Sequence, residues 1–246
     1  MENRPVVLVV EHEPECPPAH LGTWLEEAGA TLAVCRPWAG DEVPAAADLP
    51  SYDAVLVLGG SMGAHDDATS PWLGPVKHLL RAAVETDVPT LGVCLGHQLL
   101  AVALGGEVEP CATGQQVGVF DLGWTDDAEG DDLLGVVVTS APGGTVRGLQ
   151  WNSDVVTALP PGATLLAAMP GGEVQVVRFG RRAWGVQHHP EIDRAVLVSW
   201  AAGDRDDHLE KGIDSEAVLD EVEAAQSELD RCWRPLAGRL VELARR

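Results

Sequence analysis

The sequence predicts an α/β protein built on a mostly parallel, doubly wound sheet flanked by helices. Two continuous apolar runs, residues 5–10 and 53–58, are typical of parallel strands that are covered on both faces. Helical patterns with short turns alternate with these runs through residues 21–104. This alternation of strands and helices is the pattern of a parallel sheet.

The elements expected in the first half follow one another in order. A strand is expected at each of four apolar stretches and a helix at each of three segments between or after them. The strands are 5–10, 31–35, 53–58 and 88–93; the helices are 21–28, ending at Gly29, 71–85, with Pro71 in its first turn, and 99–104. Ligands of such sheets bind beyond the carboxyl ends of the strands, where Gly59 and Cys94 fall.

The second half has a different rhythm. Its short β-rich segments are separated by Gly, Pro and Asp turns and predict an antiparallel extension of the sheet, with strands at 117–124, 135–139, 145–151, 163–168, 174–179 and 183–186. An apolar helical segment then runs to Ala201, and residues 203–212 read as a polar loop. We therefore divide the chain into a domain at 1–200 and a C-terminal helical extension at 201–246.

The extension carries one apolar stripe at helical spacing. Its members are Val218, Val222, Ala225, Leu229, Cys232, Leu236, Leu240 and Leu243. Pro235 predicts a kink or a split in this helix. We expect the stripe to pack across its own domain, and a dimer or a partner helix is the alternative.

Composition excludes several kinds of partner. The formal net charge is −22, and Lys77 and Lys211 are the only lysines, so no nucleic-acid partner is expected. The five cysteines and eight histidines show no disulfide or metal-ligand spacing, and neither a metal nor a cofactor is expected. Residues 1–5 lack the pattern of a signal peptide, and no apolar run reaches the ~18 residues of a membrane span. We expect a cytoplasmic protein without membrane contact.

The segment 92–98 (Gly-Val-Cys-Leu-Gly-His-Gln) is the main candidate for chemistry. Gly-x-Cys-x-Gly between a strand and a helix is the cysteine form of a nucleophile elbow, and the helix N-terminus stabilises a thiolate. The alternative is a small apolar cysteine buried at a helix start. A base is needed, and His189 with Glu191 fits, because residues i and i+2 of an extended segment share a face. His188 is a competing base, although alternation points it to the opposite side.

Attack on an amide carbonyl also requires donors for the developing oxyanion. The N–H of Leu95, directly after the nucleophile, is one candidate. The N–H of Gly60, in the turn after the neighbouring strand, is the other. The alternative for that turn is an ordinary strand end.

Three segments together resemble the class I (triad) glutamine amidotransferases. They are residues 58–64 (Leu-Gly-Gly-Ser-Met-Gly-Ala), 92–98 and 184–191 (Trp-Gly-Val-Gln-His-His-Pro-Glu), in the family's order and near its spacing. The resemblance covers about residues 5–200 and is nearest to stand-alone proteins similar to the glutaminase part of GMP synthase. It implies a flavodoxin-like fold.

The resemblance also implies roles for individual residues. Cys94 would be the nucleophile, His189 the base and Glu191 its orienter, with Gly60 and Leu95 as oxyanion donors. Gln98 would bind glutamine, and we expect Gly59, Ser61 and Met62 to contact substrate as well.

The sequence departs from the family pattern in two places. His188 stands where phenylalanine is usual, which would widen or polarise the pocket floor. Asn152, Ser153 and Asp154 follow Trp151 where the family tends to show Trp-His-Gly-Asp, a segment that holds the α-amino and α-carboxylate groups of glutamine. We expect all four departing side chains to contact substrate. Two further pairs are read as solvent-facing, namely Gln115 with Gln116 on a strand and Asp66 with Asp67 in a loop.

Four functions are consistent with these residues. The leading one is a cysteine amidohydrolase that cleaves the γ-amide of glutamine through a γ-glutamyl thioester, giving glutamate and ammonia. Because no synthase domain is recognised beside this unit, cleavage of γ-glutamyl peptides or amines by the same triad is the alternative. A non-catalytic scaffold and a hydrolase or chaperone of the DJ-1 type are further candidates. The expected partners are a small-molecule substrate and either a synthase or a second copy bound through the C-terminal helices.

Overall fold

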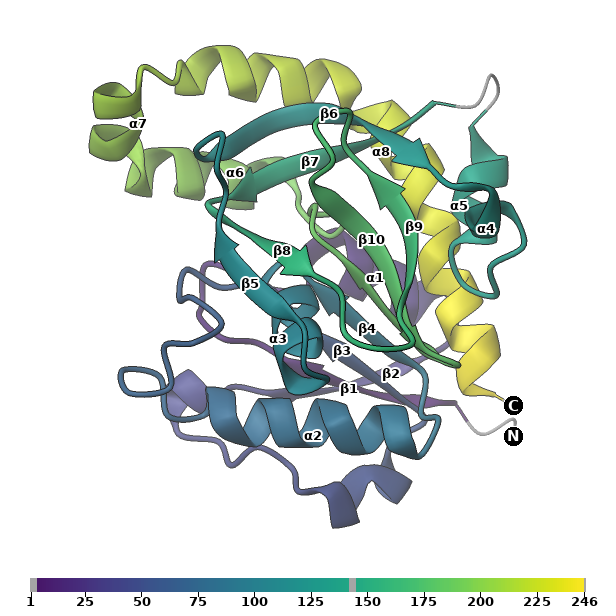
Figure 1. The fold of residues 1–246 in the computed structure, drawn as a ribbon. Coiled ribbons are helices and arrows are strands. Elements are labelled where there is room, and N and C mark those ends of the chain that lie inside the picture. The colour runs from purple at the N-terminus through teal and green to yellow at the C-terminus, as the bar shows by residue number, and fades with distance from the viewer. Residues whose placement is uncertain (1–3, 142–144, 246) are drawn as a thin grey trace.

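The computed structural model describes residues 4–141 and 145–245 (Figure 1). Residues 1–3 of the N-terminal stretch considered above lie outside these ranges. Within the described residues a nine-stranded sheet has the order β2-β1-β3-β4-β11-β10-β9-β6-β7. Its parallel strands are β1 (Val6–Val10), β2 (Thr31–Cys35), β3 (Ala54–Val57), β4 (Thr90–Val93) and β11 (Ala183–Val186).

Antiparallel strands continue this sheet beyond β11. They are β6 (Gln116–Trp124), β7 (Val146–Asn152), β9 (Thr164–Ala168) and β10 (Val174–Gly180). Two further strands, β5 (Glu107–Pro110) and β8 (Asp154–Ala158), pair with each other in a small second sheet. The predicted α/β class with a mostly parallel sheet is confirmed.

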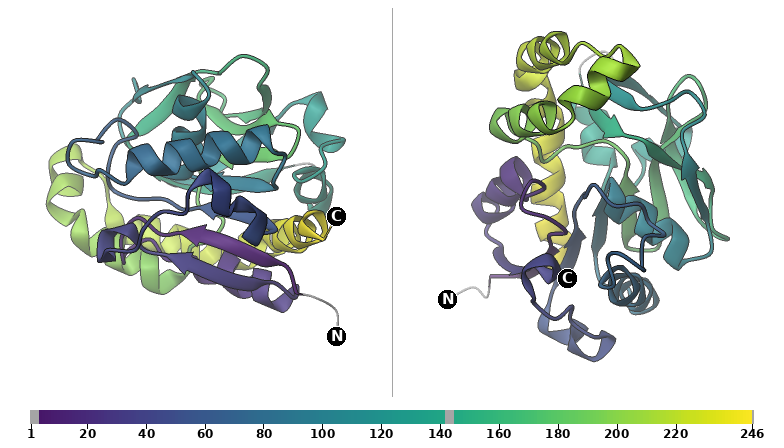
Figure 2. Two further views of the ribbon diagram at one scale, coloured as in Figure 1. Left: turned by 90° about the horizontal axis from the view of Figure 1, so that it is seen from below. Right: turned by 90° about the vertical axis from the view of Figure 1, so that its left-hand side faces the viewer.

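Helices cover both faces of the parallel strands (Figure 2). On one face lie α1 (Ala19–Glu27) and α8 (Ser215–Ala244), and on the other α2 (Leu73–Glu85) and α3 (Leu95–Ala103). Alternation along β1 divides the core in the same way, because Val7 and Val9 face the first pair of helices and Leu8 and Val10 the second. Burial on both faces explains why β1 is apolar throughout.

The C-terminal stripe packs inside the chain, as we predicted. All its members except Val218 are buried in α8, and most of them belong to the core shared with β1 and β3. Pro235 does not split α8, which is one helix of 30 residues. The boundary chosen at residue 200 lies inside α6 (Arg194–Gly203).

Two expected elements were wrong. Residues 135–139 form helix α5 (Gly135–Ser140), although valines dominate the segment. The Asp131 carboxylate accepts the N–H groups of Leu133 and Leu134 at 2.9 and 2.8 Å just before α5, and Val137 is buried in the core. Packing thus overrides β-propensity here. The segment before it contains α4 (Asp126–Glu129).

The expected polar loop at 203–212 is largely helix α7 (Arg205–Lys211). Gly212 ends it with φ of 72°, and an ion pair of 2.6 Å joins Lys211 to Asp207 one turn earlier. Short 3₁₀ helices occur at Pro37–Ala39 and Ala46–Ser51. Among the described helices none combines the length and apolarity that crossing a membrane requires.

Candidate active site

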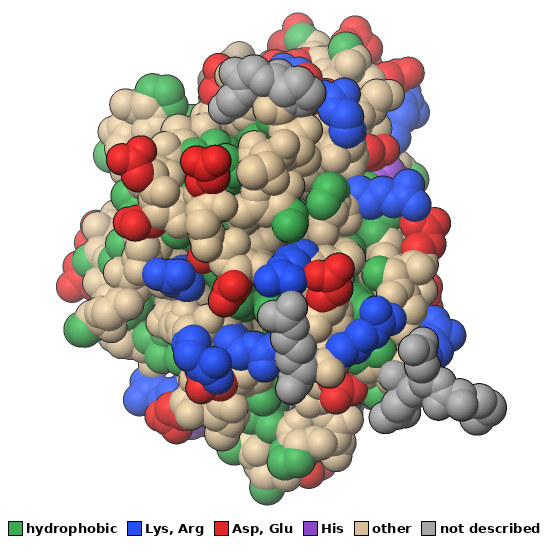
Figure 3. Space-filling view, turned by 90° about the vertical axis from the view of Figure 1, so that its right-hand side faces the viewer, with side chains coloured by type: hydrophobic (Ala, Val, Ile, Leu, Met, Phe, Trp, Pro, Cys, Tyr) green, Lys and Arg blue, Asp and Glu red, His purple; other side chains and the backbone are tan. Residues whose placement is uncertain are grey.

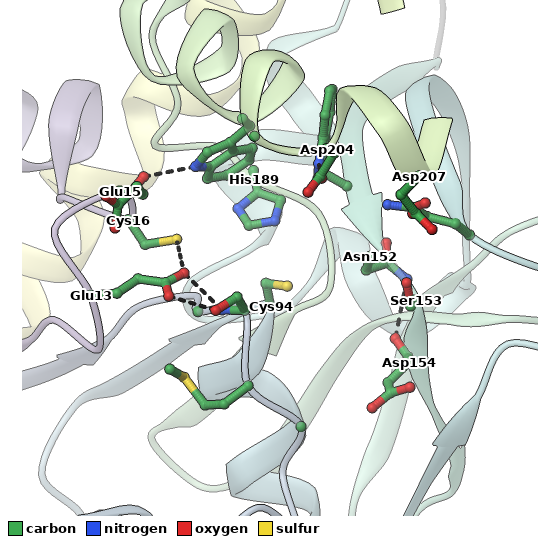
Figure 4. A pocket seen from close by; sticks show the side chains of 18 of the residues that line it. Glu13, Glu15, Cys16, Cys94, Asn152, Ser153, Asp154, His189, Asp204 and Asp207 are labelled. Carbon is green, nitrogen blue, oxygen red and sulfur yellow. Dashed lines mark hydrogen bonds between the residues drawn. The ribbon is translucent and has the colours of Figure 1, made fainter. Parts of the chain in front are cut away.

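A cavity of about 570 Å³ lies at the carboxyl ends of the parallel strands (Figure 4). The loop after β1, the turn after β3 and the elbow after β4 contribute one side of its lining. The end of β7, the start of β8, and helices α6 and α7 contribute the other. Elements far apart in the sequence therefore meet where a doubly wound sheet places its ligand.

Cys94 stands at a sharp strand-to-helix turn between β4 and α3. Its φ of 49° and ψ of −105° are strained for a residue with a side chain, as is typical of a nucleophile elbow. A Cβ atom at Gly96 would collide with the backbone of Val57, and one at Gly92 with the backbone of Gly96. The two glycines thus allow β3, β4 and α3 to approach closely, and the thiol faces the cavity with 6% of Cys94 exposed.

His189 and Glu191 form a buried pair beside Cys94. Nδ1 of His189 lies 2.8 Å from Oε1 of Glu191, and their side chains are 2% and 1% exposed. A Cβ at Gly59 would lie 3.1 Å from Cε1 of His189 and 3.6 Å from Cβ of Cys94, so the imidazole and the thiol lie close together against this glycine. Nε2 makes no other hydrogen bond among the described residues and is available to the thiol.

The surroundings of His189 favour its protonated form. Burial acts to lower the pKa of His189, but the charges of Glu191 and of the Cys94 thiolate and the hydrogen bonds of the ring raise it to about 10. An imidazolium can hold a neighbouring thiolate and can donate a proton to a leaving nitrogen.

Two backbone N–H groups near the thiol have no protein acceptor within the described residues. Leu95 is the first residue of α3, where N–H groups lack helical partners, and Gly60 follows β3. The next residue, Ser61, donates its N–H and Oγ–H to the Glu13 carboxylate at 2.7 and 2.6 Å. Glu13 therefore fixes the turn that presents the Gly60 N–H.

Three amide side chains connect the elbow to the 152–154 segment. Gln98 donates to the carbonyl of Asp154 at 3.0 Å and to Oε1 of Gln187 at 3.3 Å, while Gln187 donates to the Cys94 sulfur at 3.6 Å. Asn152 donates to the carbonyl of Asp154 at 3.1 Å. The expected contact residues Ser61, Met62, Gln98 and 152–154 all line the same cavity as Cys94.

Known proteins share this arrangement. The family model for glutamine amidotransferase class-I matches residues 23–196. The chain belongs to this family. This class I glutamine amidotransferase is 30% identical to a glutamine-hydrolyzing GMP synthase subunit of Sulfurisphaera tokodaii over 167 residues, which are 68% of this chain and 74% of that one.

Two other relatives and one solved structure extend the comparison. GMP synthase of Phenylobacterium zucineum is 36% identical over 62% of this chain and 27% of its own length; Gamma-glutamyl peptidase 5 of Arabidopsis thaliana is 28% identical over 63% and 60%. The chain thus spans less than two thirds of these two relatives. A glutamine amidotransferase from Thermotoga maritima superposes with a TM-score of 0.83 at 26% identity, covering 98% of this chain and 100% of that one.

This amidotransferase places His188 outside the cavity, contrary to our expectation. The ring is fully buried, packs at 4.3 Å between centroids on Trp233 of α8, and lies over Gly148. Burial, with repulsion from His189 and His97, holds the pKa of His188 well below 6.5. It serves as a neutral core side chain.

The glutamine pair was also misread, whereas the aspartate pair was not. Gln116 is buried and accepts a hydrogen bond of 3.3 Å from Asn152, and Gln115 lines the cavity. Asp66 and Asp67 are exposed, as expected, and Asp66 accepts the N–H of Gly63 at 2.8 Å.

Several lining residues had no recognisable signal in the sequence. They lie in the loop after β1 and on α6 and α7: Glu13, Glu15, Cys16, Ser199, Trp200, Gly203, Asp204 and Asp207. Their segments carry no motif, and only the fold brings them to the elbow. Within residues 4–141 and 145–245 no group of three or more His, Cys, Asp or Glu side chains is arranged to hold a metal ion.

Proposed function

We propose that this protein is a γ-glutamyl amidohydrolase in which Cys94 is the nucleophile, His189 the acid and base, and Glu191 its orienter. The supporting observation is the buried His189–Glu191 pair of 2.8 Å beside a cysteine at a strained elbow, all at one cavity. The substrate would be the γ-amide of glutamine or of a γ-glutamyl compound.

The reaction would run in two stages. The Cys94 thiolate attacks the γ-carbonyl carbon, and the N–H groups of Gly60 and Leu95 donate hydrogen bonds to the developing oxyanion. His189 then gives its proton to the departing nitrogen as the C–N bond breaks, which leaves a γ-glutamyl thioester. Water, deprotonated by His189, attacks the thioester, releases glutamate and restores the thiol.

A larger leaving group than ammonia is the second candidate, and the cavity favours it. Its volume of about 570 Å³ is in the range of roughly 300–1,000 Å³ that holds ligands larger than one amino acid. A relative named Gamma-glutamyl peptidase 5 supports the same reading. If glutamine is the substrate instead, a synthase that consumes the ammonia is the expected partner, by analogy with the relative that is named as one subunit of GMP synthase.

The test is steady-state release of glutamate from glutamine and from a panel of γ-glutamyl dipeptides. The wild-type protein should turn over at least one of them, and Cys94→Ala should abolish turnover. Cys35→Ser is the control, because Cys35 is a buried cysteine outside the cavity lining. Wild-type rates in Cys94→Ala would refute the proposal. Absence of both turnover and labelling of Cys94 by a diazoketone glutamine analogue would favour a non-catalytic scaffold.

A further inference from the structure

The part of the cavity beyond His189 is formed by side chains outside the three family motifs. We call it the leaving-group lobe, and it consists of Glu15, Trp151, Trp200, Asp204 and Asp207. A departing nitrogen must receive its proton from His189, so the group attached to that nitrogen has to lie next to this imidazole. Trp200 packs edge-on against the His189 ring at 4.8 Å between centroids. The leaving group therefore enters this lobe (Figure 4).

The lobe is acidic. It holds three carboxylates, and neither lysine nor arginine is among the residues that line the cavity. Asp207 is paired with Lys211 at 2.6 Å, which lies outside the lining. Asp204 accepts the Trp151 indole N–H at 2.7 Å, and Glu15 has no ion-pair partner within the described ranges. Lysine and arginine side chains instead gather among carboxylates on the far side of the molecule (Figure 3).

Two indole rings complete the lobe. Trp151 and Trp200 lie 5.9 Å apart between centroids with their planes tilted by 52°. The Trp200 ring is held in place because its N–H donates to the backbone carbonyl of Glu15 at 2.7 Å. Indole faces attract cations, and they do so most strongly where carboxylates are close by.

Asn152 gives independent evidence for a ligand with N–H donors. This residue is only 5% exposed and lines the same cavity. Its Nδ2 donates to Gln116 and to the carbonyl of Asp154, but its Oδ1 accepts no hydrogen bond from any described residue. A buried acceptor without a donor is unfavourable, so a ligand N–H is expected to fill it.

We propose that the leaving group carries a second, protonated amine, so that the substrates are γ-glutamyl derivatives of diamines or polyamines. This inference rests on the proposed function and specifies its substrate class. The γ-glutamyl C–N bond breaks as the thioester forms on Cys94, and the nitrogen that departs takes the proton of His189. The distal ammonium is retained throughout, between the carboxylates and the indoles of the leaving-group lobe.

The experiment compares three γ-glutamyl amides of equal length. Their leaving groups are 1,4-diaminobutane, n-pentylamine and 5-aminopentanoate, whose distal ends are cationic, neutral and anionic. The expected kcat/KM for the cationic amide is about tenfold above the neutral one, with the anionic amide lowest. Raising the ionic strength should reduce this preference.

Asp204→Asn is the matched variant, because its amide oxygen still accepts the Trp151 N–H while the charge is lost. It should reduce the preference for the cationic amide to about threefold or less, and Glu15→Gln should act in the same direction. The control Asp127→Asn removes an exposed charge on α4, outside the cavity lining, and should leave the preference unchanged. Thermal unfolding of each variant verifies that it is folded.

The outcomes separate the inference from the function beneath it. Equal hydrolysis of the cationic and neutral amides through Cys94 would overturn the inference and leave the proposed function standing. An equal preference in Asp204→Asn, Glu15→Gln and Asp127→Asn would overturn the role of the lobe. Failure of all three amides, of glutamine and of Cys94 labelling would refute the proposed function, and the inference with it.

Discussion

Replacing Glu191 by glutamine should change the protonation of His189 more than any other single substitution. Oε1 lies 2.8 Å from Nδ1 inside the protein, which places the two charge centres about 4 Å apart. At an effective dielectric constant of about 20, such a pair contributes about 4 kcal/mol. Since one pH unit corresponds to about 1.4 kcal/mol, Glu191→Gln should lower the pKa of His189 from about 10 by about three units.

The sign of the effect sets the pH range to examine. Because the pKa of His189 is raised, the wild-type imidazolium persists below pH 10 and its contribution to stability is lost as pH rises from about 6.5 through about 10. In Glu191→Gln the proton should leave near pH 7 or below, so at pH 8 the variant is neutral and its turnover falls.

Nuclear magnetic resonance of histidine Cε1–H groups measures this titration directly, with His189→Gln to assign the signal. Asp193→Asn is the control, since Asp193 caps α6 through a hydrogen bond of 2.9 Å to the Val196 N–H, which asparagine also accepts. A wild-type His189 that titrates near 6.5, or identical titrations in wild type and Glu191→Gln, would refute the reasoning.

Three further predictions concern the supports of the site. Glu13→Ala frees the turn at Ser61 and should lower kcat about tenfold with KM nearly constant; an equal rise in KM would instead assign Glu13 to substrate binding. His188→Phe removes a buried imidazole without partners, so urea unfolding should show about 1 kcal/mol more stability at pH 7, with activity unchanged. Because the pKa of His188 is lowered on folding, the wild type should also lose about 1.4 kcal/mol more than this variant per unit as pH falls below about 6.5; equal slopes would count against it. Gly96→Ala should destabilise by about 3 kcal/mol or more, whereas Gly238→Ala, where a Cβ meets nothing within 4 Å, should be neutral or stabilising.

The first half of the fold could be predicted because its signals are local. Continuous apolar runs identify strands buried on both faces, and Gly92 and Gly96 identify the elbow between them. The stripe of α8 could be predicted for the same reason, since its period reports the face that it buries. The parallel strands and their helices therefore follow from sequence pattern alone.

The remaining misreadings share one cause, which is packing between distant segments. Valines in α5 favour a strand, but Val137 meets the core only in a helix. His188 was read as a pocket residue because it adjoins His189, and alternation along an extended segment turns it instead toward Trp233. The polar stretch of α7 has no apolar period, yet it carries Asp204's neighbours into the cavity.

The candidate site divides along the same line. Motif-bearing segments supply Cys94, His189 and the oxyanion turn, and these could be named from residue type and spacing. The leaving-group lobe could not, because Trp200 and Asp204 lie on helices whose positions depend on the whole fold. Residues that distinguish substrates are thus less visible in the sequence than residues proposed to perform the chemistry.

The central claim is a covalent γ-glutamyl thioester on Cys94, and acid-quenched mass spectrometry during turnover tests it most directly. Protein mixed with excess γ-glutamyl substrate and quenched within one turnover should yield a peptide in which Cys94 carries one γ-glutamyl group that hydroxylamine removes. Cys16, the other thiol in the cavity lining, should stay unmodified. Release of glutamate at the full rate with no γ-glutamyl group on Cys94 would contradict the account.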